Sequence, residues 1–316
     1  MYIFADFHTH TLYSHGKGTV EENLLAGKAR GLEMVAITDH GPGSVPWVRT
    51  SLRRMRRMMD EVRFYNQRLE GIRALAGVEA NVVSLRGEID VPPDLVEELD
   101  LLLVGFHTEI IARTLAEQWK IFGRTLLARH SRAAAERARA DVTQALVEIV
   151  YRHPVDIVTH PGHKVSIETA ALARACARRG TAMEINAGHG FMTRAYAEIA
   201  ALEGAPFVLD SDAHRPGDVG RLERALAVAQ AAGLQPEQIW NARETADEPR
   251  PGEGLPHRPG RVRPNLDGLP PRWDHSRPMP GRSAGRLPQL ADGAWDDGRD
   301  VFNPDVDTEH RGPWRH

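Results

Sequence analysis

Over its first 246 residues the chain alternates short apolar runs with helical patterns, and this alternation limits the folds open to it. Several runs are continuously apolar, as expected of strands buried on both faces of a sheet. The seven predicted strands cover residues 2–6, 33–38, 73–79, 101–106, 156–159, 182–186 and 206–209. Helices are predicted at about 19–30, 47–68, 131–152, 167–179, 193–203 and 219–232. Regular alternation over seven strands predicts an α/β fold with a parallel sheet or a barrel. Residues 108–130 do not fit the alternation and are expected to form a helix or part of a lid.

Six of the seven predicted strands run into a histidine or an acidic residue at their carboxyl ends. In a barrel these ends converge on one face, where active sites are built. The motifs are Asp6-Phe7-His8-Thr9-His10, Thr38-Asp39-His40-Gly41, Gly77-Val78-Glu79-Ala80-Asn81, Gly105-Phe106-His107, Thr159-His160-Pro161-Gly162 and Asp210-Ser211-Asp212-Ala213-His214. Each motif alone has an ordinary explanation, such as a hydrogen-bonded histidine or a solvated strand end. Independent accidents would not favour the same end of nearly every strand.

The residue types at these strand ends predict metal binding. Neutral imidazole and carboxylate groups are ligands of zinc, manganese and iron, and this set suits all three metals. Cys176 is the only cysteine, so nitrogen and oxygen atoms must hold any metal. Nine candidate ligands on one face predict two or three divalent ions. The candidates are His8, His10, His15, His40, Glu79, His107, His160, Asp212 and His214.

Together these motifs resemble the PHP (polymerase and histidinol phosphatase) superfamily, and within it the small stand-alone bacterial phosphatases. The resemblance runs in order from about residue 2 to residue 241. It implies a distorted (β/α)7 TIM-like barrel that holds a trinuclear metal centre. The barrel domain is expected to cover residues 1–246.

The resemblance also implies how the nine ligands divide among three metals. The first metal would be held by His8, His10, Glu79 and Asp212. The second would be held by Glu79, as a bridge, with His107 and His160. The third would be held by His15, His40 and His214. Glu79, Asp212 and His214 are expected to be the catalytic residues.

The chain departs from the superfamily pattern at several positions. His15 stands at a variable spacing from the first histidine pair, and Asp210 replaces a common small residue. His163 stands where many relatives have an amide, so substrate contacts are expected to differ. After Asn241 a Pro/Gly-rich segment replaces the usual closing helix, which leaves the closure of the barrel bottom open.

The predicted activity is the hydrolysis of a small phosphomonoester, with histidinol phosphate as one candidate. Adjacent cations can bind a phosphate dianion and activate a water, so a metal-bridging hydroxide is expected to be the nucleophile. Lys17 and Arg215 follow ligand motifs and are expected to hold the substrate phosphate. Asp6 and Asp39 lie beside ligand histidines and are expected to accept imidazole N–H groups.

Three other functions fit parts of the pattern. A phosphodiesterase or nuclease of the same superfamily is one, although the chain carries no polymerase domain. A metal-dependent amidohydrolase also begins with His-x-His, but its usual middle-strand lysine is absent, and Glu79 and His107 stand at the middle strand ends. A non-catalytic metal-binding regulatory module is the third, and it would be expected to have lost some ligands.

Charge and composition bear on location and partners. Lys and Arg number 40 against 43 Asp and Glu, and this balance argues against a nucleic-acid partner. The N-terminus lacks a basic signal region and no apolar run is long enough to span a membrane, so a cytoplasmic protein is predicted. Residues 247–316 contain 12 Pro and 9 Gly but only 9 Leu, Ile, Val and Phe, which predicts a disordered tail or a frameshifted segment. The oligomeric state is left open.

Overall fold

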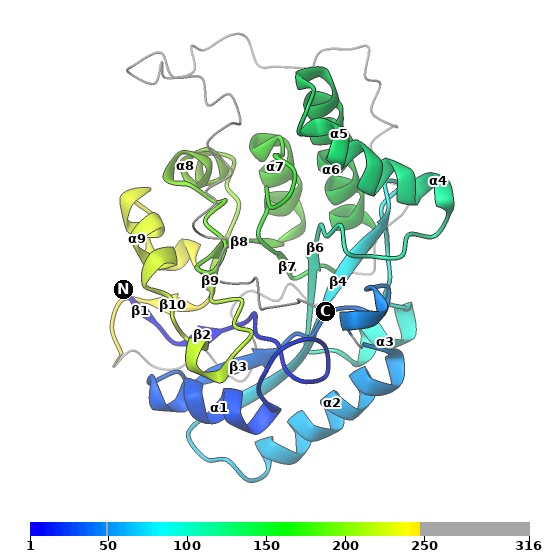
Figure 1. Ribbon diagram of the computed structural model, residues 1–316. Coiled ribbons are helices and arrows are strands. Elements are labelled where there is room, and N and C mark those ends of the chain that lie inside the picture. The colour runs from blue at the N-terminus through cyan, green and yellow to red at the C-terminus, as the bar shows by residue number, and fades with distance from the viewer. Residues whose placement is uncertain (49, 247–316) are drawn as a thin grey trace, which may run out of the picture. The chain divides into compact units, whose positions relative to one another are not determined.

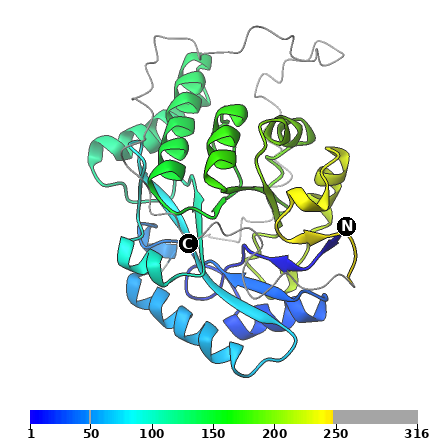
Figure 2. The same ribbon diagram turned by 180° about the vertical axis from the view of Figure 1, so that it is seen from behind.

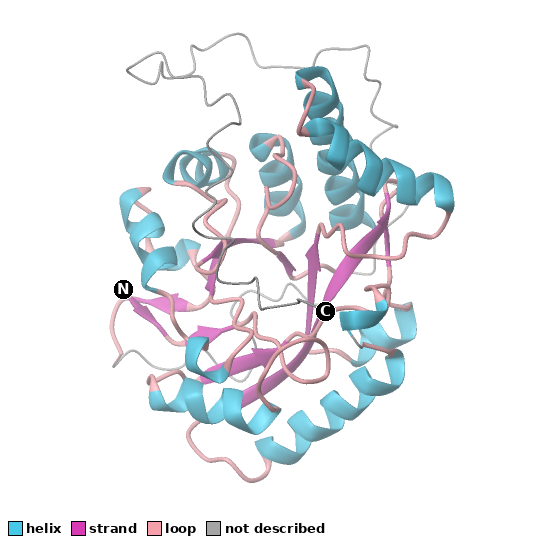
Figure 3. Cartoon of the chain, in the orientation of Figure 1, coloured by secondary structure: helices cyan, strands magenta, loops and turns pink. Residues whose placement is uncertain are grey.

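The computed structural model describes residues 1–48 and 50–246 of the chain. Parallel strands follow one another in chain order around a nearly closed ring, and helices cover the outside of the ring (Figures 1 and 3). The ring contains β2 (Ala5–Asp6), β3 (Met34–Ile37), β4 (Arg73–Ser84), β6 (Leu101–Gly105), β7 (Ile157–Val158), β8 (Ala182–Asn186) and β9 (Phe207–Asp210). All seven lie within predicted strands or overlap them. The predicted TIM-like α/β barrel is therefore confirmed.

The six predicted helices are present. They are α1 (Val20–Ala29), α2 (Leu52–Asn66), α6 (Arg132–Arg152), α7 (Thr169–Arg179), α8 (Arg194–Leu202) and α9 (Glu223–Ala231). The capping box predicted before α1 forms: Thr19 Oγ1 accepts the N–H of Glu22, and the Glu22 carboxylate accepts the N–H of Thr19.

Two helix starts were predicted several residues too early. Residues 46–48 form a 3-10 turn, and α2 begins only after Ser51, whose hydroxyl accepts the N–H of Arg54. Before α9, Gly220 has a φ of 74°, which an α-helix does not allow. Local backbone geometry, rather than the apolar pattern, sets these two boundaries.

Several short elements lie outside the predicted alternation. Residues 108–130 contain α4 (Leu115–Gln118), a π-helical turn (Trp119–Gly123) and α5 (Arg124–Ala128). Strand β4 continues beyond its expected end and pairs with β5 (Glu88–Ile89), after which α3 (Pro93–Glu98) leads into β6. Glu79 therefore lies within β4, between the level where β3 ends, opposite Ala76, and the level where β6 ends, opposite Asn81.

The strands separate two apolar clusters. The larger one packs between the strands and the helices. The smaller one fills the barrel interior near the amino-terminal ends of the strands, and this end is called the lower half or bottom of the barrel below. The interior cluster consists of Phe4, Ala5, Phe7, Met34, Ala36, Leu75, Leu101, Leu103, Ile157, Ala182, Val208 and Trp240. Its members alternate with members of the outer cluster along each strand, as the two-residue period of a β-strand requires. Polar side chains take inward positions further along, for example Glu79, four residues after Leu75 on β4.

The barrel closes between its first and last strands through the side chain of Asn241. Its amide donates to the carbonyl oxygens of Ala5 (2.8 Å) and Leu209 (2.6 Å), and its Oδ1 accepts the N–H of Leu209. Below this seam, Trp240 joins the interior cluster. The antiparallel pair of β1 (Tyr2–Ile3) and β10 (Ala242–Arg243) lies beside it (Figure 2). Within the described residues, Trp240, Asn241 and this strand pair thus lie at the barrel bottom and help to close it.

Within residues 1–48 and 50–246, no helix has the length and apolar character needed to cross a membrane. The predicted tail at 247–316 lies outside the described residues.

Candidate metal centre

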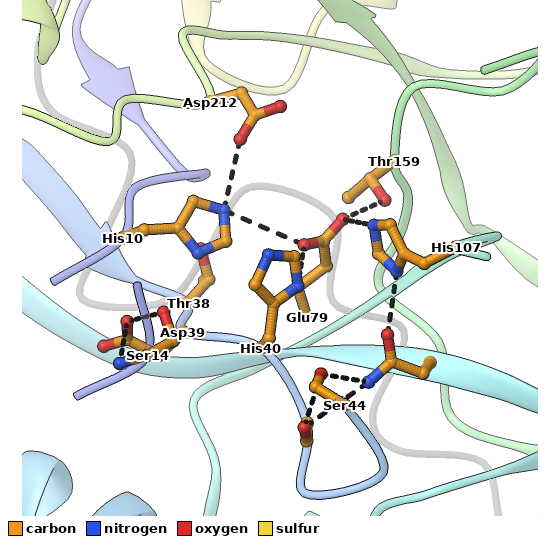
Figure 4. A network of polar contacts seen from close by, with 12 residues as sticks. His10, Ser14, Thr38, Asp39, His40, Ser44, Glu79, His107, Thr159 and Asp212 are labelled. Carbon is orange, nitrogen blue, oxygen red and sulfur yellow. Dashed lines mark hydrogen bonds and ion pairs between the residues drawn. The ribbon is translucent and has the colours of Figure 1, made fainter. Parts of the chain in front are cut away.

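The nine predicted ligands come together at the carboxyl-terminal face of the barrel. Six loops and strands supply them, and Glu79 on β4 lies at the centre of the group (Figure 4). His8, His10 and Glu79 are fully buried, whereas His40 and His107 are partly exposed. Fixed strand ends hold these side chains, so the arrangement follows from the barrel itself.

The two carboxylate oxygens of Glu79 face different histidines. Oε1 lies 2.8 Å from His160 Nε2 and 3.3 Å from His107 Nε2. Oε2 lies 2.9 Å from His40 Nδ1, 3.4 Å from His8 Nε2 and 3.7 Å from His10 Nε2. The Thr159 hydroxyl donates to Oε1 (2.8 Å) and fixes the orientation of the carboxylate. A carboxylate placed in this way can bridge two cations.

Asp212 completes the group on the side of the last strand. Its Oδ1 lies 3.1 Å from His10 Nε2 and 3.5 Å from His8 Nε2. The imidazole of His214 turns its Nδ1 towards the backbone oxygen of Asp212 (2.9 Å), which leaves its Nε2 free. His15 lies at the rim, with its ring centroid 4.4 Å from that of His214 and 4.8 Å from that of His40.

The donor atoms fit metal ions better than they fit one another. Glu79 Oε2 and His40 Nδ1 lie 2.9 Å apart at the centre, and both are buried without a hydrogen bond. The Nε2 atoms of His8 and His10 lie only 3.0 Å apart and share Asp212 Oδ1 as a neighbour. Such unpaired buried groups are costly unless a cation binds them.

Among the described residues, three groups of side chains could each hold a metal ion, because the ligand atoms within each group all lie within 4.8 Å of one another. They are His8-His10-Glu79, His40-Glu79-His107 and His10-His40-His214. The first matches part of the first predicted ligand set. In the last, His10 stands where the resemblance implied His15, so the division of ligands among the metals stays a prediction.

Buried carboxylates outside the ligand set hold the ligand histidines in place. Glu184 on β8 accepts a hydrogen bond from His8 Nδ1 (2.7 Å) and another from the backbone N–H of His160. Asn81 Oδ1 accepts from His107 Nδ1 (2.8 Å), and the Asn81 amide donates to Asp90 (2.6 Å). In both cases Nε2 is left to face the centre.

The predicted roles of Asp6 and Asp39 were wrong. Asp6 accepts hydrogen bonds from Ser211 and from the N–H of Gly220, and so connects β2 to the loop after β9. Asp39 accepts from the backbone and hydroxyl groups of Thr11 and Ser14 and fixes the loop after β2. Each lies beside a ligand histidine in sequence, but backbone N–H and hydroxyl groups are closer in space.

Sequence reasoning missed Glu184. Its signal was a single acidic residue within an otherwise apolar strand, Ala-Met-Glu-Ile-Asn, which predicts a buried charge with a specific partner. Lys17 and Arg215, the predicted phosphate contacts, are exposed. The Lys17 N–H donates to the His214 carbonyl oxygen (2.7 Å), so their two loops lie side by side at the rim.

The local electrostatics favour the metal-binding forms of Glu79 and His10. At His8 the effect of burial is outweighed by Asp212, Glu184 and Glu79, which raise the pKa of the imidazole well above its usual range. Burial disfavours the charged form of Glu79, but His107, His8 and His40 hold the pKa of its carboxyl well below the usual range. Burial together with His214 and His40 holds the pKa of His10 well below the usual range. An ionised carboxylate and a neutral imidazole are the states in which these residues coordinate cations.

Two of the predicted ligands have unusual backbone conformations. His160 has a φ of 29° and Asp212 a φ of 55°, in the left-handed region that side chains seldom occupy. Strain of this kind persists where the surrounding structure enforces it, and it gathers at functional sites. At His160, the hydrogen bond from its N–H to Glu184 holds the strained turn.

The sequence matches the PHP domain family over residues 6–187. A protein from Shewanella sp. (strain ANA-3), named probable phosphatase, is 31% identical over 251 residues, covering 75% of this chain and 86% of that protein. A probable phosphatase from Edwardsiella ictaluri (strain 93-146) is 30% identical over 252 residues, covering 75% of this chain and 89% of that protein.

One solved structure shares the fold. It is the crystal structure of histidinol phosphate phosphatase from Lactococcus lactis subsp. lactis Il1403, complexed with zinc, L-histidinol and phosphate. The TM-score is 0.51 over 73% of this chain and 94% of that chain, with 13% sequence identity.

Proposed function

Because the chain belongs to the PHP domain family and resembles its small stand-alone bacterial phosphatases, we propose that it is a metal-dependent phosphatase acting on a small phosphomonoester. The observation that carries this proposal is the position of Glu79. One of its oxygens faces His107 and His160, and the other faces His8, His10 and His40. This arrangement suits two cations held a few ångströms apart.

Two or three zinc, manganese or iron ions bound by these residues would neutralise phosphate oxygens and lower the pKa of a water molecule. The chain's own residues set up that chemistry. Glu79 and Asp212 supply the negative charge that draws cations into a buried site. Glu184 and Asn81 hold the imidazoles of His8 and His107 with Nε2 directed inward.

At the rim, Lys17 and Arg215 would bind the outer oxygens of the phosphate. Both are exposed, and their loops lie side by side because of the hydrogen bond from the Lys17 N–H to His214. Cations at this position attract a dianionic substrate and leave the opposite side of the site for the alcohol.

A phosphomonoester is favoured over the other substrates considered. The relatives named above are probable phosphatases, and the family match argues against an amidohydrolase. All nine predicted ligand positions are present in the sequence, which argues against a regulatory module that has lost catalysis. Histidinol phosphate is one candidate substrate, since the Lactococcus enzyme of similar fold is a histidinol phosphate phosphatase.

The test is hydrolysis by the full chain before and after metal removal. Protein stripped by a chelator, with its metal content checked by elemental analysis, should be inactive, and zinc or manganese should restore activity. Substrates should include histidinol phosphate, other phosphomonoesters and a phosphodiester. Full activity in verified metal-free protein would contradict the proposal, and a preference for the diester would identify a phosphodiesterase instead.

A further inference from the structure

Three rings that belong to none of the predicted ligand sets gather beside the metal centre. His163 lies in the loop after β7, and His189 and Phe191 lie in the loop after β8. The rings of His163 and His189 stack with centroids 4.3 Å apart, and Phe191 meets His163 edge-on at 4.8 Å. Offset and edge-to-face contacts of this kind are favourable arrangements for aromatic rings.

The three rings lie next to the metal centre. The His160 ring lies 5.2 Å from His163 and 5.8 Å from His189, centroid to centroid. His189 Nε2 also lies 3.3 Å from Asp212 Oδ2. A phosphate held at the cations therefore has the rings on the side of His160, away from Lys17, whose loop is bound to His214.

The rings remain accessible from outside. The His189 side chain is 30% exposed, and His163 and Phe191 are partly exposed. The Nδ1 atom of His163 is buried and has no hydrogen-bond partner. The partly exposed rings thus offer apolar surface beside the metal centre, and the buried His163 Nδ1 is a polar atom that the fold itself leaves unpaired.

We propose that His163, His189 and Phe191 bind the alcohol part of the substrate, and that this part carries a flat aromatic or heteroaromatic ring. The inference rests on the proposed phosphatase function and names the class of its substrate. The phosphate would face the cations and the basic rim, and the ring would pack against the imidazoles and Phe191. Ring contacts of this kind discriminate by several-fold.

The test compares two phosphomonoesters of primary alcohols, benzyl phosphate and butyl phosphate, in metal-loaded full-length protein. The two alcohols have similar acidity, so a difference in kcat/KM reports on the ring. The parent should prefer benzyl phosphate by about fivefold or more. Phe191→Leu and His163→Leu should bring this ratio close to one at parental metal content. Phe64→Leu, which alters an exposed ring on α2, is the matched control and should keep the parental ratio.

The outcomes distinguish a failure of the phosphatase proposal from a failure of the ring-binding inference. If the metal-loaded parent hydrolyses neither these esters nor any other phosphomonoester tested, the phosphatase proposal fails, and this inference with it. If it hydrolyses other phosphomonoesters but not benzyl phosphate, only the inference is overturned. If it hydrolyses benzyl and butyl phosphate equally well, only the inference is overturned. The inference is also overturned if Phe191→Leu and His163→Leu lower both rates by the same factor, because the rings would then act on the fold alone.

Discussion

The lower and upper halves of the barrel interior differ in chemistry, although the same strands line both. In the lower half, Leu75, Leu103 and Val208 pack with Trp240 in a dry cluster. In the upper half, two or four residues further along the same strands, the inward positions hold Glu79, His107 and Asp210. Each strand therefore passes from an apolar to an ionisable environment within a few residues.

This difference separates stability from function. Burial of the lower side chains stabilises the fold by removing apolar surface from water. The upper half places carboxylates and imidazoles in a buried space where several have no hydrogen bond, which costs stability until cations bind. Changes in the upper half should act on metal binding and catalysis, and changes in the lower half should act on folding.

The sharpest test of the upper half is Glu79→Gln. The amide keeps the shape but loses the charge that compensates two cations, so kcat should fall by at least ~10³-fold. Metal content should fall as well, as measured by elemental analysis of the purified variant. Glu97→Gln, on the exposed side of α3, is the matched control and should behave like the parent. Near-parental turnover with full metal content would rule out the bridging role.

The corresponding test of the lower half is Trp240→Ala. Removing this buried ring leaves a cavity at the barrel bottom, so the free energy of unfolding should fall by about 3–5 kcal/mol. Denaturant unfolding measures the loss, and turnover per folded molecule should stay near the parental value. Trp119→Ala, at a position 64% exposed, should cost far less. A strong loss of turnover in folded Trp240→Ala would show that the two halves are coupled.

A smaller effect on metal binding is expected from Glu184, which lies in the upper half and orients the predicted metal ligand His8. Glu184→Gln weakens the hydrogen bond that fixes His8 Nδ1, and metal affinity should fall about 10- to 100-fold. Competition with a metal-binding dye measures this affinity, and excess metal should restore most of the turnover. Glu98→Gln is the control on the surface. If affinity is unchanged while stability falls, Glu184 supports only the fold.

The smallest effect is expected from removing residues 247–316. The described residues up to 246 contain the predicted ligands, the Asn241 seam and the interior cluster. Metal content, turnover and melting temperature should therefore stay close to those of the full chain. An insoluble or inactive truncated protein would show that the C-terminal segment takes part in the domain.

The sequence was sufficient to predict the barrel and the gathering of the nine ligands. Apolar runs mark strands, and their alternation with helices predicted a parallel sheet or a barrel. The resemblance to the PHP superfamily selected the barrel, and the ligands gather because parallel strands bring their ends to one face. The hydrogen-bond partners of Asp6 and Asp39 were mispredicted, because a carboxylate selects the nearest donor in space. Glu184 was missed because it lies inside a strand rather than at its end. Short elements such as β5 and β10 depend on long-range pairing that local patterns do not reveal.

The closure at Asn241 has a consequence for the order in which the protein forms. Its side chain joins Ala5 to Leu209, and nearer the metal centre the backbone of Ala213 bonds to His8 and His10, so the ring cannot close before the last barrel strand and its loop have been synthesised. Until then the nascent chain carries an open sheet whose first strand has one unpaired edge. Contacts this far apart in sequence form slowly, because a long loop must close first. We expect His8 and His10 to meet Asp212 only at this step, so that a growing chain gains its metal centre after the last barrel strand has been made and not before.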